Sequence, residues 1–178
     1  MNRRDALKTT FLGSAVVAAG VWLGKPLAHA AGLFHDDSKA LGRLAKPASF
    51  WRGKVSDKAW AVLFEENTER PGSSPLNDNK AAGTYVCAAC YQPIFKSADK
   101  FNSGTGWPSF FDVLPASIGT KEDRSLFMLR TEYHCSRCGG HQGHVFEDGP
   151  APTGLRYCNN GLALKFIDAG SALPTLRG

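Results

Sequence analysis

Two cysteine pairs restrict the possible folds of this chain most strongly, because each has the spacing of half a metal site. Cys87 and Cys90 form the first pair, and Cys135 and Cys138 form the second. Two intervening residues let a turn direct both sulfur atoms at one cation, and two such turns complete a tetrahedral shell. The 44 residues between the pairs exceed a minimal zinc ribbon, so a sheet must bring the turns together. The pattern predicts one structural zinc ion, since four thiolates leave no open coordination position.

The spacing alone leaves two other uses of these pairs open. Paired cysteines can form disulfides in an exported protein, and a Cys-x-x-Cys sequence can be a redox pair. The repetition of the same turn, with Gly139 and Gly140 after the second pair, favours zinc over both alternatives.

The fifth cysteine, Cys158, lies outside both pairs in the segment 156–166. This segment predicts one continuous strand, on which alternate side chains share a face. Arg156 would then lie close to the thiol and favour the thiolate, which is the nucleophilic form. The alternative is a buried cysteine that packs as a small hydrophobic side chain. The predicted face comprises Arg156, Cys158, Asn160, Leu162, Leu164 and Phe166.

Residues 1–30 predict an export signal. Arg3, Arg4 and Lys8 precede an apolar stretch, and a small-x-small sequence ends at Ala30. The paired arginines resemble the twin-arginine type, which exports folded proteins. We therefore expect cleavage after about Ala30 and a periplasmic protein that meets the membrane only during export. An uncleaved anchor is the alternative, but residues 9–24 number sixteen, short of the roughly 20 that span a bilayer.

The net charge argues against a nucleic-acid partner. The 178 residues carry a formal charge of +5, of which residues 1–30 contribute +3 from four basic side chains and one acidic side chain. The remaining +2 is too weak for a basic groove. The rest of the chain is long enough for one core. We place this domain at 50–170, between a flexible arm at 31–49 and a C-terminal tail at 171–178.

Local patterns predict three further elements. Residues 60–64 predict a short helix, with Ser56 or Asp57 near its start. Residues 68–80 are rich in Pro, Gly, Ser, Asn and Asp and predict a loop. Residues 125–133 predict a strand that runs into the second cysteine pair.

Two more groups carry side chains suited to chemistry. Trp107 lies in a glycine-rich segment, where it can fill the core or line a pocket. His141 and His144 lie close together, followed by Asp148, and could act as an acid, as an orienting base or as metal ligands. An isolated histidine pair is more often structural.

In combination, these motifs resemble those of the type B methionine sulfoxide reductases, the enzymes that reduce the R epimer. The resemblance covers about residues 60–166 and implies a mainly β fold of two antiparallel sheets, of the Mss4-like or β-tent type. It also implies short N-terminal helices and a zinc site at the edge of the fold. The motifs occur in the family's order: Cys87-x-x-Cys90, Gly104–Phe110, Cys135-x-x-Cys138, His141–Phe146 and Arg156–Asn160.

The resemblance implies a role for each site residue. Cys158 would be the nucleophile that attacks the sulfoxide sulfur, and Trp107 would receive the methyl group of the substrate. His141 and His144 would hydrogen-bond and protonate the sulfoxide oxygen. Asn160 would support catalysis. Phe146, Asp148 and Arg156 would support substrate binding.

One departure from the family concerns regeneration. Many relatives carry a second, resolving cysteine, whereas here every cysteine except Cys158 belongs to a pair, and Thr105 lies in the glycine–tryptophan loop. The expected product is a sulfenic acid on Cys158 that a thioredoxin-like or other external thiol reduces. We expect oxidised proteins or peptides as substrates and a monomeric enzyme. Gly161, where many relatives have Ser, is expected to be tolerable.

Two other classes of protein share some of these features. A zinc-ribbon binding module would explain the cysteine pairs but would leave Cys158, Asn160 and His144 without a role. A catalytic metal site built on His141 and His144 lacks a further ligand with clear spacing.

Overall fold

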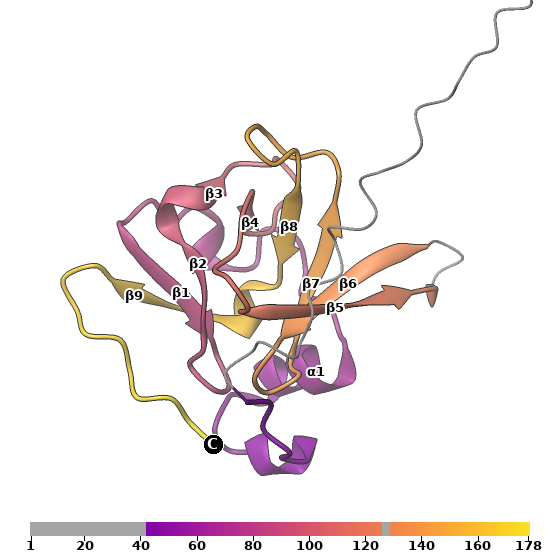
Figure 1. Ribbon diagram of the computed structural model, residues 1–178, viewed down its shortest axis with the longest axis vertical. Helices are drawn as coiled ribbons and strands as arrows, with labels where there is room; N and C mark the ends of the chain where they lie inside the picture. The colour runs from indigo at the N-terminus through magenta and orange to yellow at the C-terminus, as the bar shows by residue number, and fades with distance from the viewer. Residues whose placement is uncertain (1–41, 126–128) are drawn as a thin grey trace, which may run out of the picture.

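The computed structural model describes residues 42–125 and 129–178, so the predicted export signal and most of the predicted arm lie outside the described residues. Two antiparallel sheets form this part of the chain (Figure 1). The smaller sheet has the order β2-β1-β9, and the larger sheet has the order β3-β4-β8-β7-β6-β5. The predicted mainly β fold with two antiparallel sheets is therefore confirmed. The strands are β1 Gly83–Cys87, β2 Pro93–Lys96, β3 Lys100–Phe101, β4 Ser109–Phe110, β5 Ile118–Asp123, β6 Arg130–Cys135, β7 His141–Phe146, β8 Arg156–Asn159 and β9 Leu164–Asp168.

The predicted helix is α1, Asp57–Glu65, and its ends follow from local chemistry. The Ser56 side chain accepts a hydrogen bond from the Ala59 backbone N–H at 3.2 Å and caps the first turn. Glu66 ends the helix in the left-handed conformation, with φ of 57°. A short 3-10 turn, η3 (Ala48–Trp51), precedes α1, in agreement with the predicted short N-terminal helices.

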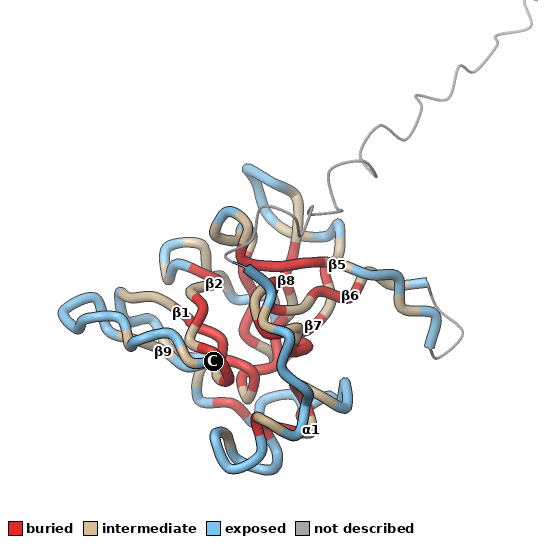
Figure 2. The backbone as a smooth tube through the Cα atoms, turned by 60° about the horizontal axis from the view of Figure 1, so that its bottom comes forward, coloured by how far each residue is buried: buried red, intermediate tan, exposed pale blue. Residues whose placement is uncertain are grey.

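An aromatic core fills the space between the two sheets. Phe95 of the smaller sheet stacks on Phe110 of the larger sheet, with ring centroids 4.0 Å apart. Tyr133 and Tyr157 meet edge to face at 5.4 Å on adjoining parts of the larger sheet. Figure 2 shows the buried backbone gathered along the middle strands, with exposed loops around it. Each such ring pair contributes about 0.5–1.5 kcal/mol beyond the area that it buries.

The segment 156–166 corrects the prediction of one continuous strand. It forms β8 in the larger sheet, the 3-10 turn η7 (Gly161–Ala163), and then β9 in the smaller sheet. The turn is stable because the Glu69 carboxylate accepts the backbone N–H groups of Gly161 and Leu162 at 2.5 and 3.1 Å. The chain thus crosses between sheets directly after Cys158, and the single predicted face does not exist.

Other boundaries differ from the predictions by a few residues. β6 begins at Arg130, later than the strand predicted for 125–133, and residues 126–128 lie outside the described part. The predicted loop 68–80 contains one 3-10 turn, η4 (Pro75–Asn77). The C-terminal tail returns to the first cysteine turn, where the Arg177 backbone N–H donates to the Cys90 carbonyl at 3.0 Å. Across residues 42–125 and 129–178, every helix is too short or too polar to cross a lipid bilayer.

Candidate active site and metal centre

The four paired cysteines form one cluster at the ends of strands from both sheets. Cys87 ends β1 of the smaller sheet, and Cys135 ends β6 of the larger sheet. The same turn follows each: the Tyr91 N–H donates to the Cys87 carbonyl at 2.9 Å, and the Gly139 N–H donates to the Cys135 carbonyl at 2.8 Å. As a result, all four sulfur atoms lie within 4.8 Å of one another, and all four cysteines are buried.

The cluster fits a tetrahedral metal ion better than it fits disulfides. The sulfur atoms of Cys87 and Cys138 are 3.6 Å apart, and those of Cys90 and Cys135 are 3.5 Å apart. Bonds of about 2.3 Å to a tetrahedral zinc place sulfur atoms about 3.8 Å apart, whereas a disulfide holds them at about 2.05 Å. Burial raises the pKa of the Cys135 thiol, so its thiolate requires a nearby cation. The Gln142 amide donates to the Cys87 sulfur at 3.6 Å and would support a thiolate there.

A second site surrounds Cys158, apart from this cluster. Cys158 is paired across the larger sheet with His144 of β7 on one side and with Ser109 of β4 on the other. A pocket of about 130 Å³ opens at this position. It brings together the predicted site residues Trp107, His144, Phe146, Cys158 and Asn160, and its other lining residues are Thr68, Arg130, Gly143 and Asn159.

The Cys158 thiol experiences two opposing influences. Burial raises its pKa above the ordinary cysteine value, while Arg156 and Thr105 act to lower it. Arg156 therefore favours the thiolate as expected, but burial has the larger effect and keeps the pKa of the thiol above its ordinary value. The proton of this thiol must therefore pass to another group before the sulfur can act as a nucleophile.

Arg156 and Asp148 form a supporting pair beside the pocket. The Arg156 guanidinium donates to both carboxylate oxygens of Asp148, at 2.7 and 2.9 Å. Its central carbon also lies 4.3 Å from the centroid of the Phe146 ring, which lines the pocket. The pair therefore positions an aromatic wall of the site, although neither charged side chain lines the pocket.

His144 is held by a carboxylate that the sequence motifs did not indicate. Its Nε2 lies 2.7 Å from Oδ2 of Asp123, at the end of β5. The same oxygen accepts a hydrogen bond from Arg130 at 2.6 Å. Burial lowers the pKa of His144, and the bond to Asp123 partly opposes that effect. The imidazole is therefore neutral near pH 7, and its orientation is set by Asp123.

His141 lies outside the pocket, unlike the histidine pair expected from the family resemblance. It is buried, its Nδ1 lies 2.8 Å from Oε1 of Glu132, and its ring centroid is 5.5 Å from that of His144. Burial lowers the pKa of His141 to about 4, so the ring is neutral. Within the described ranges, the four cysteines are the group of side chains close enough to share a metal, which does not support a metal site on the histidines.

Glu69 is the site residue that sequence reasoning missed most completely. Its backbone carbonyl accepts the indole N–H of Trp107 at 3.1 Å, and its backbone N–H donates to Oδ1 of Asn160 at 3.1 Å. Its carboxylate caps the turn η7, as described above. One buried loop residue thus connects an aromatic wall of the pocket to the chain that follows Cys158. The surrounding loop composition gave no sign of this role, because the partners are distant in sequence.

The fold and its two sites define a β-sheet protein with a metal-type cysteine cluster and a separate cysteine–histidine pocket. The chain belongs to the SelR domain family, which matches residues 55–168. These residues contain both sites, including all five cysteines.

Relatives with assigned names agree with this membership. The chain is 55% identical over 117 residues to the "Peptide methionine sulfoxide reductase MsrB" of Methanosarcina barkeri. The aligned residues cover 65% of this chain and 82% of the relative. It is 50% identical over 128 residues to the protein of the same name from Methanosarcina mazei, covering 71% of this chain and 91% of the relative. The protein of that name from Teredinibacter turnerae is 49% identical over 122 residues, which cover 68% of this chain and 90% of the relative.

Proposed function

We propose that this protein is a peptide-methionine (R)-S-oxide reductase, which converts methionine sulfoxide in oxidised proteins and peptides to methionine. The observation that carries the proposal is the pairing of Cys158 with His144 across two strands, in a small pocket that also contains Trp107. The names of the relatives support the same activity.

In the proposed reaction, the Cys158 thiolate attacks the sulfoxide sulfur. The sulfur–oxygen bond of the substrate breaks, the oxygen stays on Cys158 as a sulfenic acid, and methionine leaves. The substrate sulfur gains the electron pair that the cysteine sulfur loses. Because a sulfoxide oxygen leaves poorly unless it is protonated, the pocket needs a proton carrier. Neutral His144 takes the proton of the Cys158 thiol and delivers it to that oxygen.

Discrimination between the sulfoxide epimers requires separate places for the methyl group and for the oxygen. Trp107 offers an apolar ring for the methyl group, and the bond from its indole N–H to Glu69 fixes that ring. His144 lies on the strand next to Cys158 and receives the oxygen. His141, which is buried outside the pocket with its ring centroid 5.5 Å from that of His144, packs against His144 rather than contacting the substrate.

An external thiol regenerates the enzyme. The chain has five cysteines, and the four other than Cys158 lie in the metal-type cluster. The first reductant thiol displaces the sulfenic oxygen as water and forms a mixed disulfide with Cys158, and the second releases the Cys158 thiol and leaves as an oxidised disulfide. A thioredoxin-like protein or a small dithiol has the required chemistry.

The four-cysteine cluster binds one zinc ion with a structural role. A buried set of four thiols with tetrahedral spacing supports this assignment. When bound, zinc would hold Cys87, Cys90, Cys135 and Cys138 as thiolates and would leave no position for substrate.

Export through the twin-arginine route places the enzyme in the periplasm. The support is the sequence of residues 1–30 alone. Replacement of Arg3 and Arg4 by lysine should retain the protein in the cytosol, as measured by fractionation and by the loss of processing. Unchanged export and processing of this variant would indicate the general secretory route instead.

The activity is tested with purified protein, dithiothreitol and dabsyl-methionine sulfoxide of each epimer. We expect release of dabsyl-methionine from the R epimer only, and none from Cys158→Ser at equal metal content. Turnover of the S epimer at the same rate, or full activity of Cys158→Ser, would overturn the proposal.

A further inference from the structure

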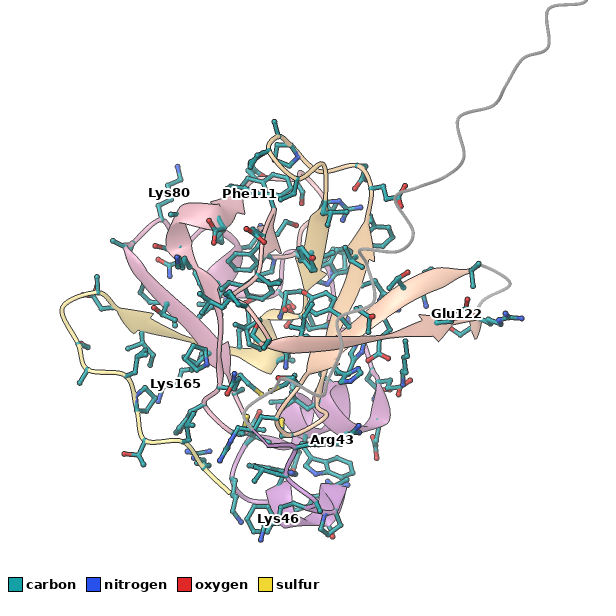
Figure 3. The ribbon with its side chains drawn as sticks, viewed as in Figure 1. Arg43, Lys46, Lys80, Phe111, Glu122 and Lys165 are labelled. Atoms are coloured by element: carbon teal, nitrogen blue, oxygen red, sulfur yellow. The ribbon has the colours of Figure 1, made fainter. Side chains whose placement is uncertain are left out.

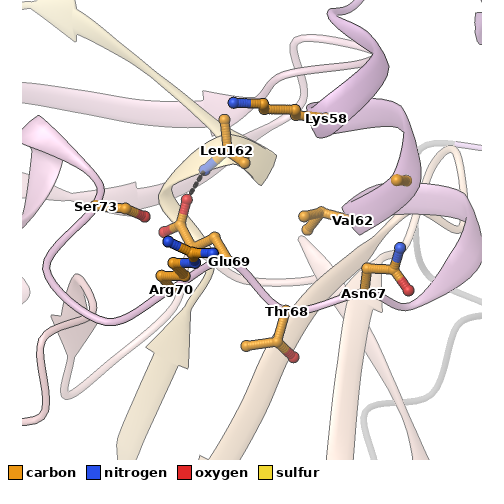
Figure 4. Close-up of a pocket in the computed structure, with 9 residues that line it drawn as sticks. Lys58, Val62, Asn67, Thr68, Glu69, Arg70, Ser73 and Leu162 are labelled. Carbon is orange, nitrogen blue, oxygen red and sulfur yellow. Dashed lines mark hydrogen bonds between the residues drawn. The ribbon is translucent and has the colours of Figure 1, made fainter.

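A second and larger cavity lies beside the Cys158 pocket. It has a volume of about 540 Å³ and is bounded by α1, by the loop that follows this helix and by the turn η7. Figure 4 shows this cavity, which we call the α1 groove. The residues that matter for its chemistry are Lys58, Val62, Thr68, Glu69, Arg70 and Leu162.

The α1 groove adjoins the Cys158 pocket at one residue. Thr68 lines both cavities, so a chain bound in one can continue into the other. The Cys158 pocket, at about 130 Å³, accommodates little more than one side chain. A polypeptide substrate must therefore place its flanking residues outside that pocket, and the α1 groove is the adjoining concave surface.

The side chains of the groove give it an excess of positive charge. Lys58 and Arg70 are both exposed, and neither forms an ion pair within the described part of the chain. The acidic lining residue, Glu69, is already bound through its carboxylate to the backbone N–H groups of Gly161 and Leu162. In Figure 4, a dashed line marks the hydrogen bond between the Glu69 carboxylate and the backbone N–H of Leu162. The exposed cations are therefore available to a ligand.

The floor of the groove is apolar. Val62 of α1 and Leu162 of η7 form part of the lining, and the methylene groups of Lys58 can extend this surface. A further cation, Lys165, lines a neighbouring cavity that shares Lys58 and Leu162 with the groove. Apolar contact with cations at the rim suits an extended peptide that carries carboxylates.

We propose that the α1 groove binds the polypeptide that flanks the methionine sulfoxide, and that Lys58 and Arg70 select acidic residues in that polypeptide. This inference rests on the proposed function, because it assigns the substrate class of the same site. The ligand chemistry is a carboxylate, supplied by an Asp or Glu side chain or by a peptide C-terminus.

The test uses short acetylated peptides with a central methionine (R)-sulfoxide, and dithiothreitol as reductant. The peptides carry Glu, Lys or Ala on one side of the methionine or on the other, and each is made with an amidated and with a free C-terminus. For wild type, we expect Glu on one side to give a lower KM than Lys, with kcat unchanged. An effect confined to free C-termini would identify the terminal carboxylate as the ligand.

The decisive variant is Lys58→Glu with Arg70→Glu. We expect a roughly tenfold rise in KM for the acidic peptide, equal to about 1.4 kcal/mol, and a fall in KM for the basic peptide. Both shifts should diminish at high salt, because exposed charges are screened. The matched control is Lys80→Glu, an exposed lysine that lies far from α1 in Figure 3 and should leave every KM unchanged.

The primary amide of dabsyl-methionine sulfoxide, which carries no carboxylate for the groove cations to bind, separates this proposal from the proposed function. If wild type does not reduce it, the proposed function fails. The groove is then tested by binding alone. Fluorescence anisotropy measures the Kd of the labelled peptides for the Cys158→Ser protein, and the same measurement is made for Cys158→Ser that also carries the two groove substitutions. Equal KM or Kd values for acidic and basic peptides would overturn the groove assignment. So would an equal loss of activity toward the uncharged dabsyl amide in the groove variant, or an effect only on re-reduction by a thioredoxin-like protein.

Discussion

Cys158 shows how one residue combines opposing physical requirements. Its burial raises the pKa of the thiol, whereas a nucleophile must lose that proton. In the proposed reaction the neighbouring His144 resolves the conflict, since a neutral imidazole can accept the proton of the thiol.

The state of Cys158 after one turnover can be predicted. Wild type treated with one equivalent of methionine (R)-sulfoxide, without reductant, should release one methionine per chain and gain one oxygen at Cys158, because the other cysteines lie in the cluster. Mass spectrometry and labelling with a dimedone-type reagent measure this outcome. Loss of two hydrogens together with zinc release would instead identify a cluster cysteine as the resolving thiol.

Asp123 should control the pH dependence of the reaction through His144. Its bond to His144 raises the pKa of a ring that burial otherwise lowers. In Asp123→Asn the His144 pKa should fall further, so the acidic limb of kcat/KM should move to lower pH. Loss of orientation should also reduce kcat by at least about tenfold, since a positioned acid contributes about 10²–10⁴-fold. The control is Glu122→Gln, which changes an exposed carboxylate on the same strand and should leave the pH profile of kcat/KM unchanged. If the acidic limb of Asp123→Asn stayed at the wild-type pH, Asp123 would not control the pKa of His144.

Residues whose chemistry is local could be predicted from the sequence, and residues whose role depends on distant contacts could not. Trp107, His144 and Cys158 belong to short motifs and line one pocket as expected. Glu69 contacts Asn160 and Gly161, which lie 91 and 92 residues away in sequence. Nothing in its loop indicates that contact. His141 belongs to the same motif as His144, and their ring centroids are 5.5 Å apart, yet His141 is buried against Glu132 and does not line the pocket.

At the scale of elements, the break between β8 and β9 explains why glycine occupies position 161. A Cβ atom there would lie 2.0 Å from Oγ and 2.4 Å from Cβ of Ser74. The Ser74 side chain therefore fills the space that a larger residue would need. Glycine at position 161 therefore fits this packing, whereas an exchange for Ser requires a change at position 74.

The contact predicts a coupled pair of substitutions. Gly161→Ser should lower the free energy of unfolding by about 1–3 kcal/mol through overpacking. Ser74→Gly, which alone should cost only a few tenths of a kcal/mol as a cap, should restore most of that loss in the double variant. Urea titration of the four proteins measures the coupling. Gly42→Ser, at a position with no neighbour within 4 Å, is the matched control; strictly additive losses would disprove the packing explanation.

The continuous strand predicted for 156–166 failed for a reason that applies to other elements. Alternation along a segment indicates which side chains share a face only if the segment stays in one sheet. The hydrogen bonds from Gly161 and Leu162 to Glu69 end β8 early, and they come from a loop that sequence patterns describe only as irregular. By contrast, α1 was predictable because its cap, Ser56, acts within one turn.

At the scale of the whole molecule, the cysteine cluster joins the two sheets. Cys87 ends a strand of one sheet and Cys135 ends a strand of the other, so a metal ion at this point ties together halves of the core. Structural zinc contributes about 10–16 kcal/mol, comparable with the whole stability of a domain.

Loss of one ligand should therefore unfold the protein. We expect Cys135→Ser to fail to accumulate or to lack metal and native circular dichroism, while Cys158→Ser keeps one zinc per chain. Metal analysis and far-ultraviolet circular dichroism measure both. A soluble, metal-free and fully active Cys135→Ser protein would refute the structural role.

The order of the smaller sheet also bears on how the chain is made. Among the strands of residues 42–125 and 129–178, β1 comes first in the sequence and lies in the centre of this sheet, and its partner β9 comes last. Until residues 164–168 have left the ribosome, β1 has one edge unpaired and the aromatic core lacks its cover from Phe166. The smaller sheet therefore cannot close before β9 has been synthesised. Truncation anywhere before β9 should leave an edge of β1 open to aggregation.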